Sequence, residues 1–543
     1  MDIFISSAKD NTVRFKNIHF EEDKPMKNYS IDFQRMPQSY WITSTPRTDY
    51  PDLNEDIEAD IAIIGGGIVG ITSAFLLKKE GYKVAVLEAD RILQGTTGHT
   101  TAKITSQHSL IYAKMQKKFG EEKALQYAQA NETALKFIAG LVQDNNIDCD
   151  FVRQSAYIFT QQDRYIPEIM EEAKIAENFG IKASFLREIP LPLPIKGAVR
   201  FDDQAQFHPR KYLLALAKEI PGKGSHIFEQ TKAVDIQQGV PCLVLTDNGP
   251  RIAASKVIIA SHYPFYEAMG LFFTRLYPER SYALGVRIKG DYPGGMYISA
   301  EDPTRSLRSQ HDKKNNLVIV GGEHHNTGQG EDTRNHYLKL RDFARQLFEV
   351  EDIPYWWSTQ DYTTMDEIPY IGNLTSDTPD VYVATGFGKW GMTTGTAAAL
   401  IFRDLILNGY SPWMDIYSPS RFTPIASAKN FVQENLNVAK HLLSGKLSSI
   451  PGTAEILKGE GKIIEYDGQR AGAYRDRQGA LHIVDTTCTH LGCELQWNSA
   501  ETSWDCPCHG SRFTYEGEII DSPAQNKLEH IQEGEQQSSG QEF

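Results

Sequence analysis

Two short segments near the C-terminal end constrain the fold more than any other feature of this sequence. The hexapeptides CTHLGC (488–493) and CPCHGS (506–511) hold four of the six cysteines in a chain of 543 residues. Each segment also places a histidine two or three residues after a cysteine. Two thiolates and two imidazoles can bind zinc, or they can bind a two-iron cluster with the cysteines on one iron and the histidines on the other. In both cases two loops must lie side by side.

The two hexapeptides resemble the cluster-binding loops of Rieske proteins, especially the disulfide-bearing kind of cytochrome complexes. This resemblance implies a [2Fe–2S] cluster with two cysteine and two histidine ligands. The implied ligands are Cys488, His490, Cys506 and His509. It also implies a disulfide between Cys493 and Cys508 that clamps the loops, and the segment DSPA (521–524) is similar to the loop that covers the cluster.

A second motif lies near the N-terminal end, where a glycine-rich turn separates an apolar run from a helical pattern. Residues 61–64 are typical of a buried parallel strand, and KVAVLE is typical of a second one. The turn has the pattern GxGxxG, which lets a pyrophosphate approach a helix N-terminus. Its glycines are Gly65, Gly67 and Gly70. Glu88 ends the second strand, where a carboxylate can bind ribose hydroxyls and disfavours a 2′-phosphate. The unit predicts a Rossmann-like dinucleotide site.

The glycine motif alone does not decide between FAD and NAD. The segment GTTGHTTAKIT (95–105) suggests a loop along a flavin, with Thr101 and Ala102 as candidate contacts. The segment VATGFGKWGMTTG (383–395) comes before a helix whose N-terminus can stabilise negative charge on a reduced flavin ring. Its candidate cofactor residues are Gly386, Gly388, Gly391 and Met392. A helix cap with glycines for packing is the alternative interpretation.

From about residue 58 to 410 the chain resembles the glycine/D-amino-acid oxidase family of flavoproteins (DadA-like). The matching segments include DIAIIGGGIVGITSAFLL, FHPRKYLLAL, FEQTKAVDI and DEIPYIGNL. The family implies FAD, a mixed-sheet substrate domain on the flavin domain, and hydride transfer from a C–H bond next to an amine nitrogen. Val234 matches the residue whose backbone contacts the adenine. No second GxGxxG is visible, which argues against a separate NAD(P)H domain.

One position departs from this family's pattern. Related oxidases carry an arginine that holds the substrate carboxylate, and counting back from Asp366 places Asp361 there. Because an acid cannot pair with a carboxylate, we expect a cationic amine, or a substrate whose acid group binds elsewhere. Alternatively, Asp361 pairs with a nearby lysine or arginine. His324 and His325 are candidates for an active-site base, with hydrogen-bonded structural histidines as the alternative.

The pattern of predicted strands, helices and turns divides the chain into segments. Strands and helices alternate after the first glycine motif, and short strands with turn signals follow the segment KLSSIPGTAE (446–455). We therefore predict an α/β plus all-β protein, with a Rossmann-like FAD-binding domain, a mixed-sheet substrate domain and a small Rieske β-domain. The predicted segments are an N-terminal extension (1–55), an oxidoreductase domain with interleaved subdomains (56–430), a connecting helix (431–450), the Rieske domain (451–532) and a disordered tail (533–543).

The net charge and the hydropathy of the chain limit the kinds of partner and the location that we expect for it. The formal charge of −14 argues against nucleic acid, whose phosphates would be repelled. No apolar run is long enough for a transmembrane segment, and the N-terminal residues lack the pattern of a secretory signal. A cytoplasmic location is the expectation.

Together the two motifs predict a dehydrogenase. Flavin accepts electrons in pairs, whereas a [2Fe–2S] cluster accepts them singly, so the cluster would carry electrons from an amine or amino-acid-like substrate to an external one-electron acceptor. The whole chain resembles a bacterial group (YhfW-type) in which a DadA-like domain precedes a Rieske domain. Two alternatives remain open: an electron-transfer reductase that feeds a partner oxygenase, and a redox sensor without turnover.

Overall fold

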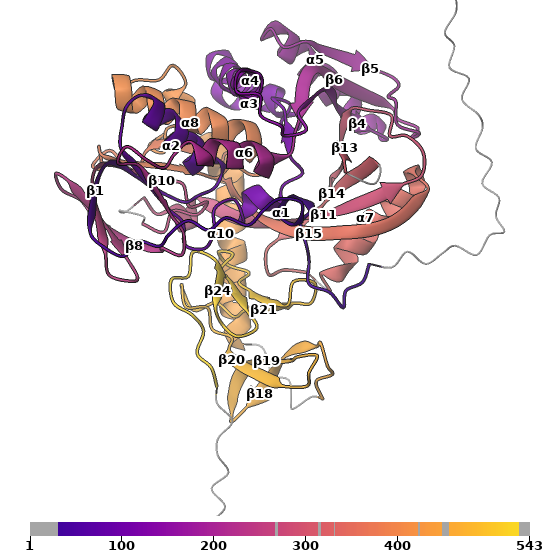
Figure 1. Cartoon of the computed structure of the whole chain (residues 1–543). Coiled ribbons are helices and arrows are strands. Elements are labelled where there is room, and N and C mark those ends of the chain that lie inside the picture. The colour runs from indigo at the N-terminus through magenta and orange to yellow at the C-terminus, as the bar shows by residue number, and fades with distance from the viewer. Residues whose placement is uncertain are drawn as a thin grey trace, which may run out of the picture.

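A computed structural model describes residues 31–266, 270–312, 316–330, 332–421, 424–447 and 455–531. Figure 1 shows a large body of sheets and helices above a small β-domain, with helix α10 (Pro424–Leu447) running from one to the other. This arrangement confirms the predicted class, an α/β region followed by an all-β domain. Residues 1–30 of the predicted extension and the predicted tail 533–543 lie outside the described residues.

The first sheet of the body has eight strands around a parallel core, in the order β16-β17-β10-β1-β2-β7, with the hairpin β8–β9 attached to β10. Apolar runs such as Ile61 to Ile64 are buried on both faces, as a parallel strand between helices requires. The strands are β1 (Ile57–Ile64), β2 (Val84–Leu87), β7 (His226–Phe228), β8 (Ala233–Gln237), β9 (Cys242–Thr246), β10 (Arg251–Ile259), β16 (Tyr370–Asn373) and β17 (Val381–Thr385).

The second sheet of the body has nine strands in the order β15-β11-β14-β13-β12-β4-β6-β3, with β5 beside β6. It is mixed, because β12 pairs with β4 in parallel while the other pairs are antiparallel. Its strands are β3 (Lys103–Ile104), β4 (Val152–Thr160), β5 (Ala183–Leu186), β6 (Gly197–Gln206), β11 (Leu276–Ile288), β12 (Met296–Ser299), β13 (Arg305–His311), β14 (Asn316–Asn326) and β15 (Val350–Thr364).

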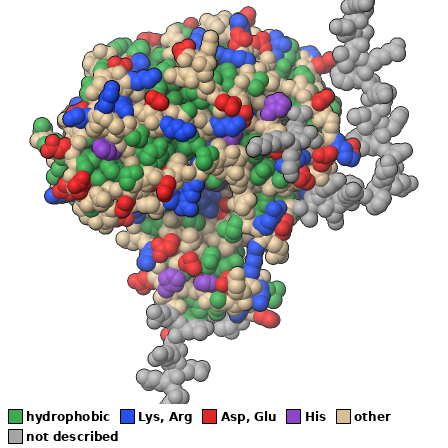
Figure 2. Space-filling view, viewed as in Figure 1, with side chains coloured by type: hydrophobic (Ala, Val, Ile, Leu, Met, Phe, Trp, Pro, Cys, Tyr) green, Lys and Arg blue, Asp and Glu red, His purple; other side chains and the backbone are tan. Residues whose placement is uncertain are grey.

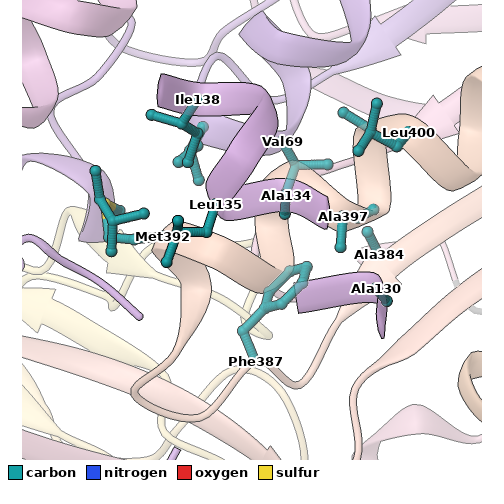
Figure 3. Packing of buried hydrophobic residues seen from close by; sticks show 14 of the residues in the cluster. Val69, Ala130, Ala134, Leu135, Ile138, Ala384, Phe387, Met392, Ala397 and Leu400 are labelled. Carbon is teal, nitrogen blue, oxygen red and sulfur yellow. The ribbon is translucent and has the colours of Figure 1, made fainter. Parts of the chain in front are cut away.

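Helices cover both sheets. They are α1 (Tyr40–Thr43), α2 (Ile68–Lys79), α3 (Ile111–Phe119), α4 (Glu121–Asp144), α5 (Ile166–Asn178), α6 (Pro209–Lys218), α7 (Arg334–Leu347), α8 (Gly391–Asn408) and α9 (Met414–Tyr417), with 3₁₀ turns at Thr96–His99, Asp163–Tyr165 and Phe272–Thr274. Figure 3 shows Val69 of α2, Ala134 of α4 and Ala397 of α8 in one buried cluster. Small side chains at this junction let the helices approach closely, which fixes the position of the α8 N-terminus. Within the described residues, we find no helix with the length and apolarity needed to cross a membrane.

The predicted N-terminal extension, residues 1–55, is not separate from the body in the half that the structure describes. Trp41 is fully buried, and its indole N–H donates to the carbonyl of Thr100 at 2.7 Å. Gln38 also forms a bridge with Trp356 of β15. The aromatic pair Tyr40–Trp41 supplies apolar area that the polar flanking residues conceal in the sequence, so residues 31–55 belong to the body.

The C-terminal domain consists of two small antiparallel sheets. The three-stranded sheet contains β18 (Gly461–Tyr466), β19 (Gln469–Arg475) and β20 (Leu481–Asp485); the four-stranded sheet contains β21 (Gln496–Asn498), β22 (Ser503–Asp505), β23 (Arg512–Thr514) and β24 (Ile519–Asp521). In Figure 1 the four-stranded sheet lies nearer the body. Figure 2 shows the domain as a smaller lobe, with acidic and basic side chains mixed on this face.

Candidate flavin cavity and iron–sulfur site

A cavity of about 680 Å³ is lined by residues of both sheets of the body. Its lining includes the glycine turn after β1, the loop after β2, the N-terminus of α8 and residues of strands β11, β14 and β15. A single elongated cavity of this kind can hold a dinucleotide along the first sheet and leave its other end for a substrate.

The glycine turn fits a pyrophosphate. Gly65 has φ +112°, and a Cβ on it would lie 2.4 Å from the carbonyl oxygen of Ala260. A Cβ on Gly70 would lie 1.8 Å from the carbonyl oxygen of Gly65, so the helix can pack this closely only with glycine there. Gly67 lines the cavity at the start of α2. The turn therefore presents backbone, without side chains, to a phosphate at a helix N-terminus.

The predicted FAD residues divide into two groups. Those that line the cavity are Gly65, Gly67, Glu88, Thr101, Gly388, Gly391 and Met392. Gly70, Ala102, Val234 and Gly386 are not in the lining. Gly386 instead packs on Thr364, and at Val234 the neighbours Lys232 and Ala233 line the cavity. Glu88 accepts hydrogen bonds from the N–H groups of Gly66 (2.8 Å) and Asp90 (3.1 Å).

The wall of the cavity between β11 and β15 is rich in polar side chains. The antiparallel register places Glu279 opposite Asp361 and Ser281 opposite Thr359, and all four line the cavity. Lys389, just before α8, forms an ion pair with Glu279 at 2.9 Å. Burial raises the pKa of Glu279, but Lys389 and the nearby His324 outweigh burial and hold that pKa below its usual value.

Asp361 is the buried acid on this wall. It is 5% exposed, and burial raises its pKa to about 7. In the described parts of the chain, no group hydrogen-bonds or ion-pairs with its carboxyl. The charge of Lys389 is the one that acts most on Asp361, but the ion pair of this lysine is with Glu279.

The two candidate histidines lie on opposite faces of β14. His324 lines the cavity, contacts Asp302 through Nε2 at 3.1 Å, and has a buried Nδ1 without a hydrogen-bond partner among the described residues. His325 does not line the cavity; its Nε2 lies 2.9 Å from the hydroxyl of Tyr282, and its ring stacks on His336. Because neighbouring side chains alternate along a strand, His325 points away from the cavity that His324 lines.

The two hexapeptides meet in the C-terminal domain. Cys488 and Cys506 are buried free cysteines whose side chains lie close enough to influence each other's pKa. The rings of His490 and His509 lie 5.0 Å apart, and both Nδ1 atoms are buried with no hydrogen-bond partner within the described chain. Two buried ring nitrogens without hydrogen-bond partners and two free cysteines form the donor set that a Rieske cluster needs, so these residues fit such a cluster.

The predicted disulfide between Cys493 and Cys508 is confirmed. The sulfurs of Cys493, Cys506 and Cys508 lie within 4.8 Å of one another, a spacing suited to a metal ion. Two of these sulfurs are bonded to each other and are not available as thiolates, so Cys488 and Cys506, with the two histidines, remain the candidate ligands.

The cluster loops dock on β15 of the body. The side-chain amide of Gln360 donates to the carbonyl of Gly510 at 2.8 Å. The hydroxyl of Tyr362 lies 2.5 Å from the carbonyl of Ser522 and 3.4 Å from that of His509. Tyr362 also lines the cavity, so one side chain touches both the cavity and the backbone of a cluster ligand.

Close backbone approaches reinforce this docking. A Cβ on Gly510 would lie 2.5 Å from Cβ of Pro278, and one on Gly328 would lie 2.7 Å from the backbone nitrogen of Pro507. Residues 520–522 of the small domain, at the end of β24, also form part of the cavity lining. The segment 521–524, which the resemblance places over the cluster, therefore also contributes to the wall of this cavity.

Sequence reasoning did not identify Glu279, Lys389, Gln360 or Tyr362. Glu279 lies in the alternating segment LYPERSYAL, where strand periodicity could have placed it on the face of Tyr277 and Ser281. The docking role of Gln360 has no local signal, because it depends on a residue 150 positions away.

Comparisons with known proteins agree with this geometry. The family described as FAD dependent oxidoreductase (DAO) matches residues 60–405, and the Rieske [2Fe-2S] domain family matches residues 448–532. A Bacillus subtilis protein described as a Rieske 2Fe-2S iron-sulfur protein, YhfW, is 44% identical over 496 residues, which cover 91% of this chain and 97% of that protein.

Two further comparisons concern the body alone. Gamma-glutamylputrescine oxidoreductase of Escherichia coli is 24% identical over 396 residues, covering 68% of this chain and 88% of that protein. The crystal structure of glycine oxidase from Geobacillus kaustophilus matches with a TM-score of 0.56 at 18% identity, covering 67% of this chain and 99% of that one. At this identity the structural match shows a shared fold.

Proposed function

Because the chain belongs to the family of FAD dependent oxidoreductases and also carries a Rieske domain, we propose that it is a dehydrogenase for an amine or amino-acid-like donor that sends electrons through its cluster to an external acceptor. FAD and a [2Fe–2S] cluster are its cofactors. When bound, FAD would supply the acceptor for a hydride from the C–H bond beside the neutral donor nitrogen, which leaves an iminium ion, and the cluster would supply a carrier for the two electrons one at a time.

The observation that carries this proposal is the shared wall between the cavity and the cluster loops. Residues 520–522 line the cavity, and Tyr362 connects the cavity to the backbone of His509. Gln360 and Gly510 hold the same loops against β15. A domain that delivered electrons elsewhere from a distant position would need no such contact, so the docking supports internal transfer.

The residues of the cavity supply binding and orientation. Glu279, Asp361 and His324 line the end away from the glycine turn, where a donor can lie with its C–H bond facing the flavin. The name of the Escherichia coli relative gives a conjugate of putrescine, an amine, as that protein's substrate. This supports an amine donor here. A cytoplasmic location stays a prediction of the sequence.

Anaerobic mixing with a panel of amines and of D- and L-amino acids tests the donor class. We expect at least one amine to bleach the visible absorbance of the flavin in the protein loaded with both cofactors. If NADH bleaches it and no amine does, the reductase alternative replaces this proposal. If neither does, the sensor alternative replaces it.

A further inference from the structure

The cavity wall between β11 and β15 carries an acid that its neighbours leave without a partner. Glu279 has a cation, Lys389, at 2.9 Å. Asp361 lies opposite Glu279 in the antiparallel register, which places both side chains on one face a few ångströms apart. Among the residues that the structure describes, the carboxyl of Asp361 has no hydrogen-bond or ion-pair partner, although it is 5% exposed.

We infer that this wall binds a positively charged nitrogen of the substrate, with Asp361 and Glu279 as its two anionic partners. The inference rests on the proposed function and narrows the donor to cationic amines. An ionised carboxyl inside a protein is costly unless a cation accompanies it. With Lys389 already on Glu279, a bound ammonium would balance two acids with two cations.

The cofactor does not provide the missing charge. FAD is itself an anion through its pyrophosphate, so it brings no cation to Asp361. Two buried hydroxyl oxygens, Ser281 Oγ and Thr359 Oγ1, lie in the next cross-strand pair and lack hydrogen-bond partners within the described residues. Hydroxyl oxygens can accept hydrogen bonds from the N–H groups of an ammonium. The wall therefore offers acceptors next to its acids.

The other cations that the structure describes near the cavity form no ion pair with Asp361. Lys103 also lines the cavity, but it lies on β3 at the opposite end of the sheet order, and the charge that acts most on it is Arg308. Arg280 follows Glu279 on β11 and forms an ion pair with Glu501 of the small domain at 3.6 Å. Neither forms an ion pair with Asp361.

Ligands that match in shape and differ in charge test this inference on the FAD-loaded full chain. The probes are n-butylguanidinium, which is permanently cationic, n-butylurea, its neutral counterpart with similar N–H donors, and pentanoate, an anion. Binding is followed by the change in the flavin absorption spectrum, and by calorimetry for any ligand that leaves the spectrum unchanged. We expect n-butylguanidinium to bind about tenfold or more tightly than n-butylurea, the size of a hydrogen bond to a charged group.

Variants assign the preference to the wall. Asp361→Asn keeps the shape of the side chain and removes its charge, so we expect the tenfold preference for the cation to fall to about twofold or less. Glu279→Gln should reduce it as well. Asp352→Asn is the matched control, because Asp352 lies on the same strand, is paired with Arg287 and does not line the cavity. This control should keep the preference.

Equal binding of the urea and the guanidinium to the unaltered chain, or tighter binding of pentanoate, would overturn the inference without any variant. An unchanged preference in Asp361→Asn would do the same. If amines bleach the flavin but the charged and neutral probes bind with equal affinity, this inference fails and the proposed function stands. If the cation is preferred while no amine bleaches the flavin, the cation site stands and the proposed function fails.

Discussion

At the scale of single residues, the free-energy cost of burying the Asp361 carboxyl depends on pH. Burial raises the pKa of Asp361 to about 7; Lys389 and Arg280 oppose this, Glu279 adds to it, and His324 lies beside Glu279. The folded chain therefore binds this proton more tightly than the unfolded chain does. The stabilisation is full at low pH and is lost as the pH rises through about 7.

This linkage predicts how Asp361→Asn changes thermal stability. The variant cannot ionise, so without amine its melting temperature relative to the parent chain should rise by a few degrees between pH 5 and pH 8. Differential scanning calorimetry of the two FAD-loaded chains measures the shift. A difference that stays constant over this range would contradict the pKa assigned to Asp361.

The cluster ligands give a second prediction at this scale. Cys506→Ser replaces a thiolate by a much weaker ligand, so iron and acid-labile sulfide should fall close to background while the FAD content stays near one per chain. The matched control is Cys242→Ser, which alters a buried free cysteine in the body. Retention of a full cluster in Cys506→Ser would remove Cys506 from the ligand set.

Single residues were predictable where one motif contains the whole site. The hexapeptides contain all four candidate ligands, because loop spacing and side-chain chemistry are both local. Asp361 was found by its position in a longer pattern. Glu279 and Lys389 were not found, because their meeting depends on the register of β11 and on the turn before α8.

At the scale of elements, β15 serves both sites. Its residues 359, 361 and 363 line the cavity, whereas Gln360 between them donates to Gly510 in the small domain. Strand alternation makes this possible, since neighbouring side chains leave opposite faces. The contact is close because Gly510, with φ +80°, has no Cβ to meet Pro278.

Gly510→Ala tests this contact. The added Cβ would lie 2.5 Å from Pro278, so we expect the loops 506–511 to separate from β15 and their backbone amides to exchange hydrogen at least tenfold faster. Gly468→Ala is the matched control: it has a similar φ of +73° but no atom within 4 Å of its Cβ. Equal exchange in both variants would show that the close contact does not hold the loops.

Most elements could be predicted from local patterns. The apolar run before Gly65 and the glycine turn before α8 carry clear signals, and the structure has a strand and a helix at those places. The segment around Trp41 was misjudged because two buried aromatic residues in a polar stretch give no steady period. Its burial depends on distant partners such as Thr100.

At the scale of the whole molecule, the account depends on how the two domains meet. Each domain was predictable from its own motif, but the sequence does not say which surface of the Rieske domain faces the flavin cavity. That surface is set by contacts such as Tyr362 with Ser522, between residues 160 positions apart. Such pairings are specified by the complete fold and have no local pattern.

The most direct test of the central claim is the reduction state of the cluster after a donor has reduced the flavin. The protein loaded with both cofactors is mixed anaerobically with an amine that bleaches it, and samples frozen over time are measured by electron paramagnetic resonance. We predict that the reduced-cluster signal rises with the loss of flavin absorbance and reaches about one spin per chain. Complete bleaching of the flavin with the cluster still oxidised would contradict transfer within the chain.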